Sequence, residues 1–421
     1  MKSNKLKKII TETKKSSKEL LELGSFQRKK ILLILADQIK KKSKKILIEN
    51  QKDIEIARKK FLNESLVERL MLNEARILDM AKAIRTIAIG EDNLFKIISE
   101  VKRPSGIEIK KVIFPLGLIA IIYESRPNVT IDAFSLCFKS GNALVLKGGK
   151  EIENTNKVLV VLIKKILKEN NLNPNIINNL AGLKKEQVSE ILINKNIDCV
   201  IPRGGKGLIE FVSKNSQVPV IITGASVVHT YIDKSADLNL AKKVILNAKE
   251  RRVSICNALD TILLHEDILD KFLSLSAEEL AEKKVELRAD NNSYKFLKKL
   301  NYPNLRKAAS LDFDTEFLDH ILAIKSVKNF EEAISHIQQH SLGHSEAIIT
   351  ENKKQVADFY RKVDAACLYH NTSTQFGDGG EYGMGGEIGI STQKLHARGP
   401  FGYKELTTYK YLVKSNGAIR K

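Results

Sequence analysis

The segment from 118 to 147, LIAIIYESRPNVTIDAFSLCFKSGNALVLK, indicates the fold most directly. Its two ends, Leu118–Tyr123 and Ala143–Lys147, are short apolar runs with little alternation, which is typical of strands buried on both faces. Between them, Thr130–Lys139 has helical spacing. The segment therefore predicts a strand, a helix and a second strand parallel to the first.

The same alternation continues after this segment. We expect helices at 151–169, 184–194 and 208–214, and strands at 176–180, 198–201 and 218–222. Five strands alternating with helices predict a right-handed, mostly parallel, doubly wound sheet. Ligands bind such a sheet at the carboxyl ends of its strands.

A second α/β pattern follows residue 258, and other segments frame the two patterns. The second pattern predicts strands at 259–264, 320–327 and 346–350, and helices at 266–275, 277–284, 330–339 and 352–363. Residues 1–90 are expected to be helical, because Ile31, Leu32, Leu35 and Ile39 recur at helical spacing. An exposed hairpin at 101–114 and a final strand at 404–413 complete the prediction.

Composition excludes several classes of protein. The chain has 421 residues, 43% of them hydrophobic, and no apolar run approaches the ~18–20 residues of a membrane-spanning helix. The basic N-terminus has no cleavable apolar core, so we expect a cytoplasmic protein without membrane contact. Four cysteines lie far apart, which predicts reduced thiols with no disulfide and no metal site: Cys137, Cys199, Cys256 and Cys367.

The net charge of +20 raises the alternative of a nucleic-acid-binding protein. Its lysines are spread along nearly every predicted helix, whereas a nucleic-acid site concentrates its charge beside aromatic residues. Aromatic residues make up only 6% of the chain and tryptophan is absent. We therefore expect no nucleic-acid partner. Binding that survives at ~0.15–0.2 M salt would favour the alternative.

Cys256 is the strongest candidate for a catalytic residue. It lies in the stretch NAKERRVSICNA, 247–258, after the basic residues Lys249, Arg251 and Arg252. A thiolate is the reactive form of cysteine, and nearby positive charge lowers the pKa of a thiol. The alternative is a buried core cysteine, which packs as a small hydrophobic residue.

Two glycine clusters follow predicted strands. Gly148–Gly149 comes directly after Lys147, and Gly204–Gly205 directly after Arg203. Glycines let backbone N–H groups approach phosphates at a helix N-terminus, and both cations stand where an anionic cofactor would lie. Because the GxGxxG fingerprint is absent, ordinary strand-to-helix turns remain the alternative.

The tail from 372 to 402 is rich in glycine, which allows loops to pack closely against a ligand or another backbone. Lys394, His396 and Arg398 in this tail could hold a carboxylate or a phosphate. Arg398 could instead pair with Glu381 or Glu387 and order the loop.

Seven blocks of the sequence together match the pattern of one known family. The blocks are PLGLIAIIYESRPNVT at 115–130, GNALVLKGG at 141–149, VIPRGG at 200–205, CNALDTILLH at 256–265, FDTEFLDHILAIKSV at 313–327, FEEAISHIQQHSLGHSEAIIT at 330–350 and STQFGDGGEYGMGGEIGISTQKLHARGPFGYKELTTYKYLV at 373–413. In these blocks the sequence resembles the gamma-glutamyl phosphate reductase (glutamate-5-semialdehyde dehydrogenase) family, a branch of the aldehyde dehydrogenase superfamily. Gln375 departs from the arginine that is frequent in that family.

The resemblance implies a reaction and a set of residue roles. Cys256 would attack L-glutamyl 5-phosphate to form a thioester, which NADPH would reduce to L-glutamate 5-semialdehyde in proline biosynthesis. Asn128 would stabilise the oxyanion, although it could equally be a turn residue after Pro127. The other roles implied are cofactor binding by Lys147, Gly148, Gly204, Gly205 and Glu316, and substrate binding by Arg126, Lys394, His396 and Arg398.

The resemblance also implies an aldehyde-dehydrogenase-like architecture. An NADPH-binding domain would comprise 1–98, 114–228 and 366–399, a catalytic domain 229–365, and an oligomerisation element 99–113 with 400–421. The implied partners are further copies of the chain and glutamate 5-kinase as the supplier of substrate. An aldehyde-oxidising dehydrogenase is the alternative, but 222–229, ITGASVVH, lacks the glutamate base of those enzymes. A bifunctional kinase–reductase is not expected, because no residues remain for a kinase half.

Overall fold

The computed structural model describes residues 3–62, 64–183, 185–224 and 226–420. Its internal contacts divide the chain into two compact units, each made of more than one segment. The first unit comprises Met1–Thr223, Tyr382–Gly389 and Leu395–Lys421. The second unit comprises Gly224–Glu381 and Ile390–Lys394.

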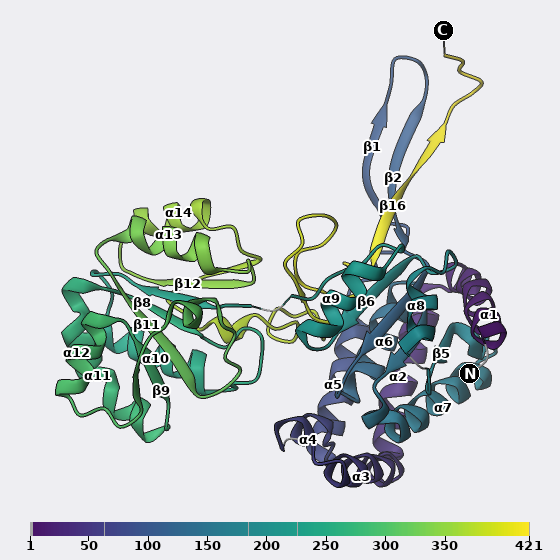
Figure 1. The fold of residues 1–421 in the computed structure, drawn as a ribbon. Helices are drawn as coiled ribbons and strands as arrows, with labels where there is room; N and C mark the ends of the chain where they lie inside the picture. Colours follow the sequence, from purple (N-terminus) through teal and green to yellow (C-terminus); the bar gives the residue numbers. More distant parts are fainter. Residues whose placement is uncertain (1–2, 63, 184, 225, 421) are drawn as a thin grey trace. The chain divides into compact units, whose positions relative to one another are not determined.

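The first unit is built on a parallel four-stranded sheet in the order β5-β4-β3-β6 (Figure 1). Its central strands are almost wholly apolar, with Lys147 near the end of β4 as the charged exception, because helices cover both faces of a parallel sheet. The strands are β3 (Leu118–Tyr123), β4 (Ala143–Gly148), β5 (Ile177–Asn179) and β6 (Cys199–Arg203).

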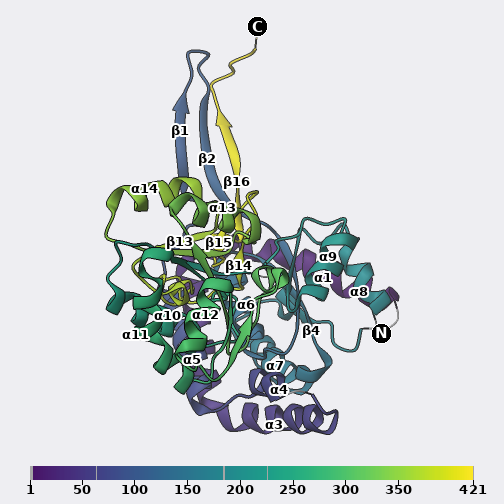
Figure 2. The same ribbon diagram turned by 60° about the vertical axis from the view of Figure 1, so that its left-hand side comes forward.

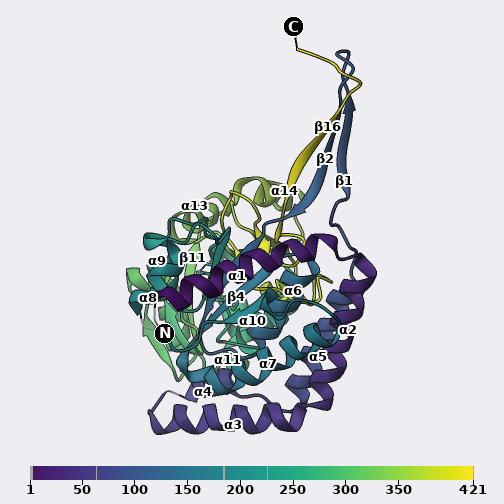
Figure 3. The ribbon, with the colours of Figure 1, turned by 90° about the vertical axis from the view of Figure 1, so that its right-hand side faces the viewer.

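Helices surround this sheet. Helix α1 runs along β3, β4 and β5 (Figure 3), while α2 and α5 pack together and against α6. Apolar residues at helical spacing form these contacts, among them Ile31, Leu32, Leu35 and Ile39, which are all buried as predicted. The helices are α1 (Ser3–Glu22), α2 (Ser25–Lys41), α3 (Ser43–Lys59), α4 (Glu64–Leu70), α5 (Glu74–Ile89), α6 (Asn128–Lys139), α7 (Glu153–Glu169), α8 (Lys185–Leu192) and α9 (Lys206–Asn215).

The prediction of a fifth strand in this sheet, at 218–222, is wrong. Residues 218–222 form only an isolated bridge, between Val220 and Val200 of β6. Pro219 lies within this segment and has no N–H to donate to a ladder, which limits regular pairing. Lys184, where a helix was expected to begin, lies outside the described residues.

The second unit contains a parallel seven-stranded sheet in the order β10-β9-β11-β8-β7-β12-β13. Its strands β8, β9, β11 and β12 are labelled in Figure 1, and β13 is labelled in Figure 2. Its strands are β7 (His229–Ile232), β8 (Thr261–His265), β9 (Glu286–Ala289), β10 (Leu305–Lys307), β11 (Ile321–Val327), β12 (Ser345–Ile349) and β13 (Cys367–His370).

Successive residues of these strands are buried on opposite faces. Ile262 and Leu264 join one core cluster, with α10, α11 and α12, while Leu263 joins a second cluster, with α13 and α14. This alternation explains why β8 is apolar without a polar face. The helices are α10 (Leu238–Glu250), α11 (Leu269–Glu282), α12 (Asn291–Lys299), α13 (Phe330–His340) and α14 (Lys353–Lys362).

Two expectations for this region need correction. The helices predicted at 266–275 and 277–284 are one continuous helix, α11, because Ser276 bonds back to the carbonyl of Phe272 and does not end it. The segment 366–399 was assigned to the cofactor domain, yet β13 pairs with β12 in the second sheet. Most of the segment therefore belongs to the second unit.

A three-stranded antiparallel sheet, which we call the arm, extends from the first unit in all three views (Figures 1–3). It consists of β1 (Ile97–Lys102), β2 (Glu108–Pro115) and β16 (Thr407–Lys414), so the predicted hairpin and final strand pair with each other. Two further short strands are β14 (Ile390–Ser391) in the second unit and β15 (Gly399–Pro400) in the first. Among the described residues, no helix combines the length and apolar character needed to cross a membrane.

The buried carboxylate of Asp53 joins α3 to the beginning of α7. Asp53 is only 1% exposed, and its Oδ2 accepts hydrogen bonds from the backbone N–H and the hydroxyl of Thr155, at 2.8 and 2.6 Å. Its Oδ1 accepts from the backbone N–H of Asn154 at 3.1 Å. A side chain from another helix thus satisfies donors in the first turn of α7.

We predict that Asp53→Ala lowers the free energy of unfolding by about 2–4 kcal/mol, because several buried donors lose a charged acceptor. Urea-induced unfolding measures the change. Asp79→Ala is the matched control, since Asp79 is exposed on α5, and it should change stability by less than about 0.5 kcal/mol. Equal losses in both variants would contradict the capping role.

Candidate active site

Cys256 differs from the other three cysteines in its accessibility. It lies in the loop between α10 and β8 and is partly exposed, whereas Cys137, Cys199 and Cys367 are buried. Burial raises the pKa of the Cys199 thiol to about 12 and raises the pKa of Cys137 further. The alternative of a core cysteine therefore applies to the other three and not to Cys256.

The loop that carries Cys256 closes on itself. The N–H of Leu259 donates to the carbonyl of Ala248 at 3.0 Å, so the chain returns to the end of α10 after ten intervening residues. Gln375, which is buried, donates from Nε2 to the same carbonyl at 2.7 Å and to that of Arg252 at 3.4 Å. Its Oε1 accepts from the guanidinium of Arg251 at 3.2 Å.

A second pair of contacts holds the other limb of this loop. Thr374 donates from its hydroxyl to the carbonyl of Asn257 at 2.7 Å, and the Asn257 amide donates to the carbonyl of Gly377 at 2.9 Å. Thr374 and Gln375 lie in one short 3₁₀ turn, Thr374–Phe376. The beginning of the glycine-rich tail thus fixes both limbs of the nucleophile loop.

Ser226 lies between Cys256 and Glu316. Its hydroxyl donates to the carbonyl of Cys256 and lies 3.3 Å from Oε1 of Glu316. Burial, with the negative charge of Asp260 as the second cause, raises the pKa of Glu316 to about 7. The structure therefore places Cys256 and Glu316, both predicted site residues, around one buried serine; Ala225 before it lies outside the described residues.

Two buried charged residues support this cluster, and sequence reasoning gave neither a structural role. The Asp260 carboxylate accepts from the N–H of Phe317 at 3.0 Å and from that of Val228 at 3.1 Å. The Lys249 ammonium is fully buried and donates to the carbonyl of Leu259 at 3.0 Å. Burial lowers the pKa of Lys249 to about 8 and raises that of Asp260 to about 6. An aspartate inside the apolar run 258–264 was the signal available in the sequence.

In the first unit, Lys147 is the next-to-last residue of β4 and precedes two glycines. Its ammonium donates to the carbonyl of Gly148 at 2.8 Å, and burial lowers the pKa of this lysine. A Cβ at Gly148 would lie 2.2 Å from the amide nitrogen of Asn156. Close packing against α7 thus explains this glycine without a ligand.

The N-terminus of α9 already receives an anion. Gly205 is its N-cap, and the N–H of Gly205 donates to the Glu124 carboxylate at 3.1 Å. A Cβ at Gly204 would lie 2.4 Å from that same carboxylate. The donors at this strand end suit a negatively charged group such as a cofactor phosphate, because the helix dipole adds to the backbone N–H groups.

The turn between β3 and α6 carries two more predicted residues. Ser125 has a left-handed φ of 49°, and the Glu151 carboxylate holds its N–H at 2.7 Å. Arg126 is half-buried in this turn. The Asn128 amide donates to Asp132 at 2.9 Å, which uses one of its two amide hydrogens.

The tail cations divide between the two units, and two of them have contacts within their own unit. Lys394 belongs to the second unit and forms an ion pair with Asp364. His396 belongs to the first unit, has a left-handed φ of 70°, and its Nε2 lies 2.7 Å from the carbonyl oxygen of Glu405. Arg398 is half-buried in the first unit. A role as a substrate ligand therefore has a structural competitor for Lys394 and for His396.

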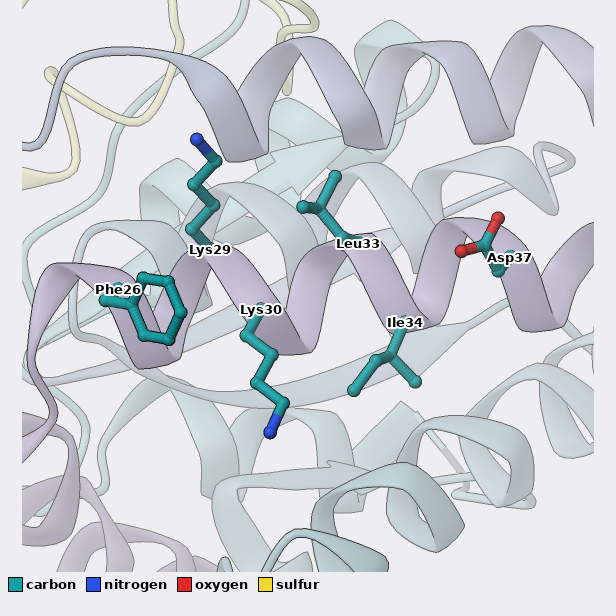
Figure 4. Close-up of a pocket in the computed structure, with 6 residues that line it drawn as sticks. All are labelled: Phe26, Lys29, Lys30, Leu33, Ile34 and Asp37. Atoms are coloured by element: carbon teal, nitrogen blue, oxygen red, sulfur yellow. The ribbon is translucent and has the colours of Figure 1, made fainter.

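A groove on the first unit is a separate feature. All six residues that line it lie on α2 (Figure 4): Phe26, Lys29, Lys30, Leu33, Ile34 and Asp37. Its lining residues include two lysines and one aspartate but no thiol, so the candidate chemistry lies at Cys256.

Comparison with known proteins places the chain in a family. The model of the aldehyde dehydrogenase family matches residues 1–294. Gamma-glutamyl phosphate reductase of Legionella pneumophila (strain Corby) is 49% identical over 413 residues, which cover 98% of each chain. The corresponding protein of Carboxydothermus hydrogenoformans is 44% identical, with the same coverage.

Solved structures agree in fold. The crystal structure of gamma-glutamyl phosphate reductase from Thermotoga maritima has a TM-score of 0.93 and 41% identity, and covers 98% of this chain and 99% of its own. An acetylating aldehyde dehydrogenase from Geobacillus thermoglucosidasius shares the fold, with a TM-score of 0.73 at 17% identity and coverage of 100% and 98%. The aldehyde-dehydrogenase-like α/β fold predicted from the sequence is thus confirmed, and the chain belongs to the gamma-glutamyl phosphate reductases within the aldehyde dehydrogenase family.

Proposed function

We propose that this oxidoreductase catalyses the NADPH-dependent reduction of L-glutamyl 5-phosphate to L-glutamate 5-semialdehyde in proline biosynthesis, with release of phosphate. The observation that carries the proposal is the partly exposed thiol of Cys256 on a loop fixed at both limbs. An assay of phosphate-dependent NADP⁺ reduction with glutamate 5-semialdehyde tests it in the reverse direction. Oxidation of the aldehyde at the same rate without phosphate would favour the aldehyde-oxidising alternative.

The chain's own residues perform the acyl transfer. The Cys256 thiolate attacks the acyl carbon, and the S–C bond forms as the acyl C–O bond breaks and phosphate leaves with its electron pair. The backbone N–H of Cys256 and the remaining amide hydrogen of Asn128 are the proposed donors to the oxyanion. When bound, NADPH would supply a hydride to the thioester carbon, and the C–S bond would then break, with its electron pair returning to Cys256 as the semialdehyde leaves.

Several residues would hold the cofactor. Lys147 would meet its 2′-phosphate or adenosine ribose, and Gly204 and Gly205 its diphosphate at the N-terminus of α9. Gly148 would allow close approach beside them. Glu316 would accept a hydrogen bond from the nicotinamide ribose, a role that its position next to Ser226 and the nucleophile loop supports.

The surroundings of Cys256 favour reduction over hydrolysis of the thioester. No glutamate occupies 222–229 to activate a water molecule. Glu346 is fully buried and lies 3.1 Å from Nδ1 of His229, so its carboxylate is already engaged. A thioester that is not hydrolysed remains available for reduction by the hydride.

The arm is the proposed contact between copies of this chain. Its strands present apolar side chains to solvent, including Ile97, Val101, Tyr411 and Val413, and β1 leaves an open edge. Exposed edges of this kind are usually covered by a partner. Glutamate 5-kinase, which would make the labile acyl phosphate, is the proposed functional partner.

We predict that Cys256→Ser lowers kcat by at least about 10³-fold, because a hydroxyl lacks the nucleophilicity of a thiolate at neutral pH. Steady-state kinetics measure the loss. Cys137→Ala is the control, and its effect should fall on thermal stability more than on rate, since Cys137 is fully buried. Retention of most activity by the Cys256 variant would exclude the thioester mechanism.

Lys147→Ala should weaken NADPH binding by about 1.5–3 kcal/mol, the value of a charge-assisted hydrogen bond, and weaken NADH binding less. Titration with both cofactors provides the comparison, with NADH as the internal control. Equal losses would assign the lysine to the shared ribose or to its bond with the Gly148 carbonyl.

Arg398→Ala should raise KM for the amino-acid substrate and also lower kcat, because an anchored α-carboxylate orients the distant reacting carbon. An arginine that only orders the loop would lower the melting temperature and leave KM near its normal value. Kinetics and thermal unfolding of the same variant therefore decide between the two roles.

A further inference from the structure

Arg251 is an exposed arginine that a buried side chain holds in place. Its Nη1 donates to Oε1 of Gln375 at 3.2 Å, and Gln375 is itself fixed by two backbone carbonyls. Within the described part of the chain, Arg251 forms no ion pair with a carboxylate. Arginine has five N–H donors, so most of its hydrogen-bonding capacity remains for a ligand. An ordered cation without an acidic partner suits an anion.

The closed loop places this cation on the limb opposite the nucleophile. Arg251 lies three residues after Ala248, and Cys256 lies three residues before Leu259. The N–H of Leu259 bonds to the carbonyl of Ala248 at 3.0 Å, so the limb 248–251 and the limb 256–259 start from one hydrogen bond. Arg251 and Cys256 are therefore the same number of residues away from it. Three residues span at most about 10 Å, so Arg251 and Cys256 both lie within about that distance of the closing bond, and the long side chain of Arg251 extends beyond its backbone position.

We propose that Arg251, positioned by Gln375, binds the phosphate group of the acyl phosphate and, in the reverse direction, inorganic phosphate. This inference rests on the proposed function and assigns a residue to the leaving group. As the S–C bond forms, the acyl C–O bond breaks and its electron pair leaves with phosphate. Arg251 donates hydrogen bonds to that increasing negative charge and transfers no proton. Its planar fork matches two phosphate oxygens.

The reverse reaction separates the phosphate from the other ligands. The full-length enzyme is assayed with glutamate 5-semialdehyde and NADP⁺ while inorganic phosphate is varied, and each KM is measured in turn. Arg251→Gln should raise KM for phosphate by about ten-fold or more, the effect of losing a charged hydrogen bond. KM for the semialdehyde and for NADP⁺ should stay within about two-fold.

Arg252→Gln is the matched control, because it removes the same charge from the next exposed residue, which bonds to Gln375 through its backbone carbonyl and not, among the bonds of the described residues, through its guanidinium. It should change KM for phosphate by less than about three-fold. Gln375→Leu removes the contact that holds Arg251 and should also raise KM for phosphate more than the other two KM values. A loop that merely lost order would instead lower kcat and the melting temperature with no preference among substrates.

Three results would overturn the assignment. Equal increases of KM for phosphate in Arg251→Gln and Arg252→Gln would mean that phosphate responds to the local positive charge and not to Arg251 itself. An increase confined to KM for the semialdehyde would assign Arg251 to the substrate carboxylate, and one confined to NADP⁺ to the cofactor. If the unaltered enzyme shows no phosphate-dependent reduction of NADP⁺, the proposed function itself fails, and that result is distinct from all three.

Discussion

The carboxylate of Asp260 determines how the segments that carry Cys256, Ser226 and Glu316 are arranged in the second unit. It is nearly inaccessible, and it accepts one N–H from the segment that carries Ser226 and another from the segment that carries Glu316. Burial of this charge is costly unless it is compensated. The two N–H donors and the positive charge of buried Lys249 provide that compensation. The relative positions of Glu316, Ser226 and the carbonyl of Cys256 therefore depend on one side chain that contacts none of the substrates proposed.

Local pattern was enough to predict the four strands of the first sheet and three of the seven strands of the second, β8, β11 and β12. β3 matches its predicted limits and β4 extends one residue beyond them, because an uninterrupted apolar run between glycine-rich turns has few other solutions in a parallel sheet. Cys256 could be selected for its chemistry alone. Gln375 could not be linked to it, since a glutamine in a glycine-rich tail carries no sign that it contacts a loop 120 residues earlier in the chain. Contacts between segments that are distant in the sequence can be identified only once the fold is known.

The errors share a physical cause, which is that short segments depend on their neighbours. β9 and β10 received no prediction, because they are strands of four and three residues in which half or more of the residues are charged. Their pairing with β11 and with each other decides their conformation. The segment 218–222 shows the reverse case, in which an apolar and β-branched run forms only one bridge. Propensity alone does not decide either outcome.

The discontinuous first unit has a consequence for synthesis on the ribosome. Its core includes Phe401 and Leu406, and the outer edge of β2 is covered by β16, so both await the last part of the chain. The second sheet, in contrast, is complete once β13 has emerged. A nascent chain therefore holds a finished second sheet while the first unit is still unfinished, with an apolar hairpin edge exposed throughout elongation. Chaperone binding, or early pairing between neighbouring nascent chains, would protect that edge during this interval.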